Sequence, residues 1–259
     1  MHASGFKWMA YCFVLLVAVL PTRVVQAGSE LQAIQEMRSL AFSVCANVLV
    51  YFNENGNPYG PGNRQSYQRC MARLQSLATS QRLADVVLEL EHLRSSLNDT
   101  TELPQSEAEL RRTSPGYTRW LLPVVDSHAR LQALLDAHYT RSDIDDAEEL
   151  QRELHALSRD VGQLLLGYQI ASFSRLGAQQ WVMSDQQVLE HDQRVLDAFT
   201  RLPALNPELG GALVDPARQY TFSRQQLLNQ GGRWVPNALE RYLGMAMVKI
   251  DQAASELPR

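Results

Sequence analysis

Lysine and cysteine are scarce in this chain. Only Lys7 and Lys249 are lysine, so nearly all of the 24 basic residues are arginine. Arginine binds carboxylates and phosphates through a planar fork, but a genomic codon bias explains the imbalance more simply. The three cysteines, Cys12, Cys45 and Cys70, form no C-x-x-C or C-x-x-C-H string. This spacing argues against a covalent haem and against a C-x-x-C redox pair.

The signatures of common catalytic sites are also missing. The sequence has no H-E-x-x-H zinc motif, no G-x-S-x-G motif and no P-loop. A di-iron bundle needs two E-x-x-H helices, and only Glu89–His92 fits that spacing. His128 and His138 lie ten residues apart, so their rings point about 80° apart on a helix. We therefore expect no metal, no cofactor and no enzymatic activity, with an enzyme of dispersed site as the remaining alternative.

The N-terminal segment predicts export. Residues 8–20 carry no charge, and the small-residue site Val25-Gln26-Ala27 follows shortly after Pro21 and Arg23. This is the pattern of a secretory signal peptide, cleaved after Ala27. The apolar run is shorter than the roughly 20 residues that a membrane-spanning helix needs. We expect a periplasmic or secreted protein, and the alternative is an N-terminal inner-membrane anchor.

The charge of the chain disfavours two classes of partner. The formal net charge is −4 and becomes more negative when Lys7 and Arg23 leave with the signal peptide. A mildly acidic protein is a poor general ligand for nucleic acid or for anionic lipid. No later apolar run reaches membrane-spanning length. We therefore predict no nucleic-acid partner and no stable membrane span after cleavage.

The apolar residues recur at helical spacing almost throughout. Steps of three and four predict helices that end at Tyr51, begin near Asn63, continue with a shifted phase from Leu83, and begin again near Pro123, Ile144 and Pro236. The period-two alternation of a strand is not seen. The sequence therefore predicts an all-α fold, an elongated antiparallel helical bundle of five to seven helices with coiled-coil-like faces.

A Gly/Pro-rich tip separates the first two helices. The stretch NENGNPYGPGN, residues 53–63, stops either helix from continuing through it. Cys45 and Cys70 lie almost symmetrically about this tip, so an antiparallel hairpin puts them at the same height. An exported protein also meets an oxidising environment. We predict a Cys45–Cys70 disulfide that staples the N-terminal hairpin.

Two regions of the C-terminal half leave the domain organisation open. The helical pattern from residue 143 to residue 200 is either one long helix or two helices, with Ser184 and Gln187 forming a capping box at the break. Residues 202–216 hold three Pro and two Gly, which predicts a loop with at most a short helix capped by Asn206. We therefore expect one domain over 28–259, with a sub-boundary near 184–206.

Five residues are candidates for a ligand site. Arg175 falls on the apolar stripe of a helix, where an inward arginine must be paired or reach a cavity. The tryptophans Trp120, Trp181 and Trp234 each lie near a helix end or break, where they either seal the core or line a pocket. Tyr59 lies in the Gly/Pro-rich tip, as either a turn residue or a binding residue.

Two functions fit these observations. The absence of catalytic motifs and the long helix faces favour a non-enzymatic interaction or accessory protein of the bacterial cell envelope, with another envelope protein as its partner. Arg175 and the tryptophans favour instead a helical bundle that binds a small ligand, for example an anion. In general architecture the chain resembles helical sensor domains that lie outside the inner membrane, but no motif residue carries that resemblance.

Overall fold

The described part of the chain consists of eight α-helices and one 3₁₀-helix and contains no strand. The computed structural model describes residues 20–53, 55–98, 117–141, 149–173, 179–229 and 233–257, without the side chains of 20–29, 117–120 and 179. The all-α prediction is confirmed, and the predicted count of five to seven helices is too low. The helices are α2 (Leu20–Tyr51), α3 (Pro61–Ser80), α4 (Ala84–Asn98), α6 (Tyr117–Arg141), α7 (Glu149–Ala171), η3 (Gln179–Trp181), α8 (Asp185–Leu205), α9 (Leu209–Leu228) and α10 (Pro236–Ser255).

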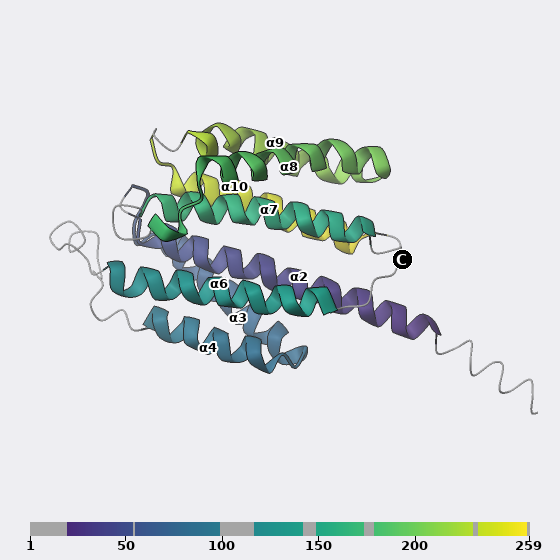
Figure 1. Cartoon of the computed structure of the whole chain (residues 1–259), viewed down its shortest axis with the longest axis horizontal. Helices are drawn as coiled ribbons and strands as arrows, with labels where there is room; N and C mark the ends of the chain where they lie inside the picture. Colours follow the sequence, from purple (N-terminus) through teal and green to yellow (C-terminus); the bar gives the residue numbers. More distant parts are fainter. Residues whose placement is uncertain are drawn as a thin grey trace, which may run out of the picture.

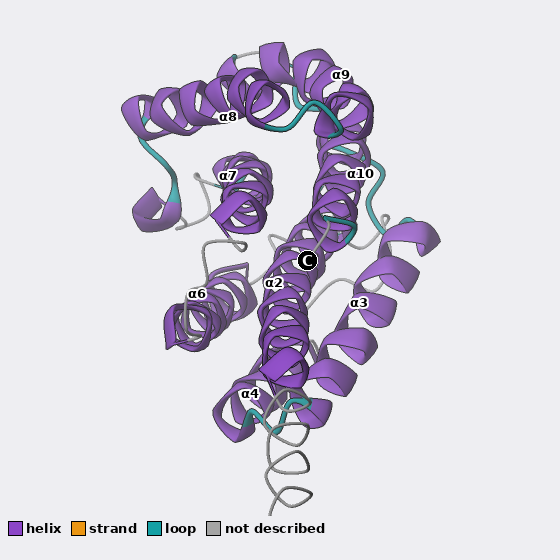
Figure 2. Cartoon of the chain, turned by 90° about the vertical axis from the view of Figure 1, so that its right-hand side faces the viewer, coloured by secondary structure: helices purple, strands orange, loops and turns teal. Residues whose placement is uncertain are grey.

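The long helices run along the long axis of the molecule (Figure 1). Seen from the end, α8 and α9 form one layer, α7 and α10 lie below them, and α2 lies between α6 and α3 with α4 beneath (Figure 2). Neighbours α2 and α6, α7 and α8, and α9 and α10 are antiparallel. Helices α2 and α7 are parallel, because Gln32, Ser39 and Asn53 each meet an α7 or post-α7 residue 119 positions later. The bundle is therefore only partly antiparallel.

The predicted N-terminal hairpin is present, formed by α2 and α3. At its tip Tyr59 has a φ of 58°, and its N–H donates to the Tyr51 carbonyl at 2.7 Å. Pro61 stands in the first turn of α3, where the missing N–H costs no helical hydrogen bond. Further along, Arg73 of α3 donates to Glu36 of α2 at 2.7 Å. These contacts bring the two helices back against each other over their length.

The predicted disulfide is absent, because Cys45 and Cys70 are both free thiols. The side chain of Glu36 faces α3, because it accepts a hydrogen bond from Arg73. Cys45 lies nine residues after Glu36, which is about two and a half helical turns, so it lies on the opposite side of α2. Cys45 therefore points away from α3 and is fully buried, whereas Cys70 is half-buried. Symmetry about the tip fixed the height of the two residues but not their direction around each helix.

The break near Ser184 is the correct choice between the two alternatives. Helix α7 ends at Ala171 and α8 begins at Asp185. The Ser184 hydroxyl accepts from the Gln187 N–H at 3.2 Å, and the Gln187 side chain accepts from the Ser184 N–H at 2.9 Å, which completes the predicted capping box. The chain then turns back, so that α8 packs antiparallel on α7.

The predicted loop over 202–216 is wrong. Helix α8 continues through Pro203 to Leu205, and α9 already starts at Leu209 and contains Pro216. Asn206 ends α8 and accepts a hydrogen bond from the Glu208 N–H at 3.0 Å, so it shapes the turn and does not cap a short helix. Burial of Leu209, Leu213 and Tyr220 against the neighbouring helices outweighs the poor helix propensity of the prolines and glycines.

A polar cluster lies inside the core where α2, α7 and α10 meet. Asp251 of α10 is buried and accepts from the Gln35 amide at 3.1 Å, with Ser39 and Ser158 also hydrogen-bonded to it. Burial raises the pKa of Asp251 to about 6, against the hydrogen bonds that lower it. Gln32 donates to the Asp251 carbonyl at 3.1 Å. These bonds fix the register of three helices.

Candidate ligand-binding cleft

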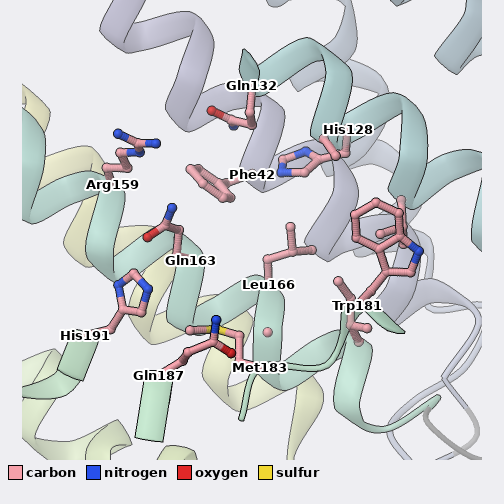
Figure 3. A pocket seen from close by; sticks show the side chains of 14 residues that line it. Phe42, His128, Gln132, Arg159, Gln163, Leu166, Trp181, Met183, Gln187 and His191 are labelled. Carbon is pink, nitrogen blue, oxygen red and sulfur yellow. The ribbon is translucent and has the colours of Figure 1, made fainter. Parts of the chain in front are cut away.

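A cleft opens between α6 on one side and α7 with α8 on the other, with α2 at its base. It has two parts, which we call the inner cavity, of about 270 Å³, and the outer groove, of about 700 Å³. The two parts share Arg159, Gln163 and His191 in their linings. Figure 3 shows these three side chains grouped at one end of the inner cavity, with His128 and Trp181 at the other end. The parts are therefore adjoining sections of one cleft.

Each helix turns one face to the cleft, and the residues recur at steps of three and four. Helix α7 contributes Arg152, Ala156, Arg159, Asp160, Gln163, Leu166, Gly167 and Ile170. Helix α6 contributes Val125, His128, Ala129, Gln132, Asp136, Tyr139 and Thr140, and α8 contributes Gln187, His191 and Arg194. This is the spacing of neighbours on one side of a helix. The lining is thus part of the same amphipathic pattern that builds the bundle.

Arginines dominate the outer groove. Arg38, Arg152, Arg159 and Arg194 line it, against the two carboxylates of Asp136 and Asp160. Asp136 accepts from Arg38 at 2.5 Å with one oxygen and from Arg159 at 2.6 Å with the other. One carboxylate therefore balances two guanidinium groups. The described lining therefore holds more arginines than carboxylates, in a chain whose net charge is −4.

Asp160 pairs with the basic residues of α8 that line the groove. It accepts from Arg194 at 3.0 Å and makes a 2.7 Å contact with Nδ1 of His191. Burial raises the pKa of Asp160, but the hydrogen bonds from His191 and Arg194 lower it overall. Asp160 therefore stays ionised and keeps Arg194 directed along the groove.

The pKa values of Arg38 and His155 are lowered first by burial and then by neighbouring arginines. The Arg38 side chain is 5% exposed, and its pKa is lowered by burial and by Arg159, although Asp136 opposes the shift. Burial, then Arg38 and Arg152, lower the pKa of His155 to about 3. His155 is therefore neutral at pH 7. An anion placed here would meet a field that already disfavours further positive charge.

Tyr139 connects the groove to the core. The Arg38 guanidinium lies 4.4 Å and the Arg152 guanidinium 5.1 Å from the centre of the Tyr139 ring. Because His155 is neutral, the Tyr139 hydroxyl donates to its Nδ1 at 2.9 Å, and the His155 Nε2–H donates to Gln32 at 2.8 Å. These contacts hold the two arginines against a fixed aromatic surface.

The inner cavity is mainly apolar, and two residues of its lining carry buried hydrogen-bond acceptors without described partners. His128 is 4% exposed, and burial lowers its pKa to about 4 despite a hydrogen bond to the Ala41 backbone. Its Nδ1 has no partner in the described part of the chain. Gln132 donates to the Arg38 carbonyl at 3.0 Å, which directs its Oε1 away from that bond, and this buried oxygen also has no described partner.

Of the five candidate site residues, the structure places Trp181 in the cleft. Trp181 lines the inner cavity, and Figure 3 shows its ring nitrogen turned away from Leu166. Trp234 lies elsewhere, with its ring 4.8 Å from that of Tyr168. Tyr59 packs in the hairpin tip, 5.2 Å from the Tyr51 ring. Arg175 and the side chain of Trp120 lie outside the described residues.

The polar lining residues were missed by the sequence analysis. The signal that could have found them is a second stripe on the α7 sequence, Arg152–Arg159–Gln163, beside the apolar stripe. Polar stripes of this kind usually face solvent, so nothing local marked this one as the wall of a cleft. No group of three or more His, Cys, Asp or Glu side chains suited to a metal ion is found among the described residues.

The comparisons with known proteins give no family. No protein-family model matches the chain, and no curated protein and no solved structure is significantly similar to it. None of the helices in the described ranges is long and apolar enough to cross a membrane. The fold and the cleft therefore define the class of the protein: an all-α bundle with an arginine-rich cleft between α6 and α8.

Proposed function

We propose that this protein is an exported helical bundle that binds a small organic anion in the outer groove. The observation that carries the proposal is a groove of about 700 Å³ lined by four arginines and two aspartates, in which Arg38 and Arg159 pair with Asp136 and Arg194 pairs with Asp160. Arginine is suited to carboxylates and phosphates because its planar fork can form two parallel hydrogen bonds. The reason for placing the protein outside the cytoplasm is the signal peptide predicted from the sequence of residues 1–27.

The arginine side chains of the groove are also preorganised by their neighbours. Asp136 orients Arg38 and Arg159, the Tyr139 ring supports Arg38 and Arg152, and Asp160 orients Arg194. Fixed donors lose little conformational entropy on binding, which favours affinity.

Calorimetric titration of the purified protein with a panel of carboxylates and phosphates tests the proposal. We expect Arg159→Gln to weaken binding by about 10- to 100-fold, because a hydrogen bond to a charged group contributes about 1.5–3 kcal/mol. The matched control is Arg201→Gln. Arg201 is also exposed and paired with a carboxylate, Glu153, but it lies outside the groove lining. Binding should weaken with added salt.

Two results would contradict anion binding at this groove. One is a panel in which no anion binds to the unmodified protein. The other is an anion that binds equally well to Arg159→Gln, Arg201→Gln and the unmodified protein.

A second candidate function is interaction with another envelope protein. It is favoured by exposed apolar side chains on α9 and α10, since Phe222 is 67% and Val248 64% exposed. Crosslinking in envelope extract, with the Phe222→Glu, Val248→Glu double variant as the comparison, tests this candidate. Identical crosslinked species for the variant and the unmodified protein would argue against this surface.

A further inference from the structure

The inner cavity and the outer groove offer one ligand two different environments. Arg159, Gln163 and His191 line both parts, so a molecule whose acidic group lies among the arginines can extend past them. Beyond that junction the lining carries no further charged side chain, and it includes Phe42, Leu166 and Met183. Figure 3 shows Phe42 and Leu166 between the junction and the His128–Trp181 end. The far end of the ligand must therefore be uncharged.

The unpartnered acceptors of His128 and Gln132 indicate which chemical groups the uncharged end of the ligand has. His128 and Gln132 are four residues apart on α6, so they are neighbours on one wall. Each is oriented by a bond to α2 backbone: Ala41 accepts from the imidazole, and the Arg38 carbonyl accepts from the Gln132 amide. The atoms left over, Nδ1 of His128 and Oε1 of Gln132, are buried acceptors without a described partner. Buried acceptors of this kind call for a donor.

A carbonyl group on the ligand would need a hydrogen-bond donor, and Gln163 can supply one where the two parts of the cleft join. Gln163 makes no side-chain hydrogen bond to any described residue and lines both parts of the cleft. Its amide can donate to a carbonyl oxygen of the ligand. A cavity of about 150 Å³ holds a benzene ring, so the 270 Å³ of the inner cavity accommodates one substituted ring.

We propose that the inner cavity binds a planar amide-type head, so that the ligand is a small organic acid with a lactam, imide or ureido N–H at the end opposite its acidic group. The N–H groups of the head donate to His128 Nδ1 and Gln132 Oε1, and the acidic group lies at Arg159, the arginine that lines both parts of the cleft. This inference rests on the anion-binding function proposed above and adds the chemical class of the ligand. Ordered water in the inner cavity is the competing occupant.

Two matched pairs of probes test the head group by calorimetric titration of the purified protein. Orotate and benzoate are six-membered-ring carboxylates with and without ring N–H groups. Hydantoin-5-acetate and cyclopentylacetate are the five-membered-ring counterparts. We expect the N–H member of a pair to bind about tenfold more tightly, which is the factor that one hydrogen bond of ordinary net strength gives. Uracil, which has the head without the acid, should bind more weakly than orotate.

Variants separate the two parts of the cleft. Gln132→Met removes the acceptor and replaces it with a side chain of similar size. The affinities for orotate and benzoate should then become nearly equal, and the affinity for benzoate should change less than twofold. Arg159→Gln should weaken both acids by the same factor. The control is Gln193→Met, an exposed glutamine of α8 that lies outside both linings and should change neither affinity.

A direct measurement avoids any doubt about folding of a variant. Long-range ¹⁵N NMR of the unmodified protein should show a neutral His128 ring whose Nδ1 resonance moves on addition of orotate but not of benzoate. Equal affinity within both probe pairs, with benzoate still binding, overturns the head-group inference and leaves anion binding standing. With that result, ordered water remains as the occupant of the inner cavity. Failure of all four acids to bind overturns both proposals.

Discussion

Asp251 should make the stability of this protein fall as pH rises. Its side chain is buried where α2, α7 and α10 meet, and its pKa in the folded state is about 6, compared with 3.8 for an ordinary aspartate. The causes are burial first, opposed by hydrogen bonds from Ser39, Ser158 and Gln35, with Glu36 adding a like charge. The folded protein therefore holds this proton at pH values where the unfolded chain has released it.

The sign and size follow from proton linkage. A carboxyl with a raised folded pKa contributes its stability fully below pH 3.8 and loses it as pH rises through about 6. A shift of about two pKa units corresponds to roughly 3 kcal/mol, of which about 2 kcal/mol is lost between pH 4.5 and 7.5. Asp251→Asn removes the titration but keeps the shape and an acceptor for Gln35.

Urea unfolding at a series of pH values measures this directly. We expect the stability of Asp251→Asn relative to the unmodified protein to rise by about 2 kcal/mol between pH 4.5 and 7.5. The control is Asp215→Asn, because Asp215 is exposed and Lys249 lowers its pKa, so its small pH effect has the opposite sign. A relative stability of Asp251→Asn that does not change with pH would refute the reasoning.

Three further predictions follow from local contacts. Without reductant, a thiol reagent should modify Cys45 and Cys70 in denaturant. In the native state it should modify Cys70 slowly and leave Cys45 unmodified, because burial raises the pKa of Cys70 and raises that of Cys45 to about 12. Gly162→Ala should cost about 1–2 kcal/mol in urea unfolding, because the new methyl would lie 2.6 Å from the Phe42 ring. Ser184→Ala should cost about 1 kcal/mol in the same assay, because it removes the cap of α8.

Each of these has a control or a contradicting result. Failure to modify Cys45 and Cys70 in denaturant without reductant would support the disulfide between them. Gly62→Ala is the control for the glycine substitution, because nothing lies within 4 Å of its added methyl, and it should stabilise α3 slightly. A Gly162→Ala protein as stable as Gly62→Ala would show that the Phe42 ring moves aside. An unchanged Ser184→Ala would show that the core, not the cap, sets the start of α8.

The sequence determined the local structure well where helix signals were consistent. Apolar spacing predicted α2, α3 and α10, the Gly/Pro-rich tip predicted the hairpin, and the Ser184–Gln187 spacing marked the start of α8. These features depend on residues close in sequence, so they can be read without the fold. The prediction failed over 202–216 because tertiary burial overrode the propensity of proline and glycine.

The cleft and the state of the cysteines were decided by tertiary structure alone. Arg38, Asp136, Arg159 and Arg194 come from α2, α6, α7 and α8, and no sequence spacing brings them together. Similarly, the direction of Cys45 around α2 depends on which side of that helix α3 occupies. Helical periodicity says which residues share a face of one helix, whereas which faces meet is settled by packing several helices at once. The arrangement of α6, α7 and α8 in the bundle therefore places their polar faces around one arginine-rich cleft.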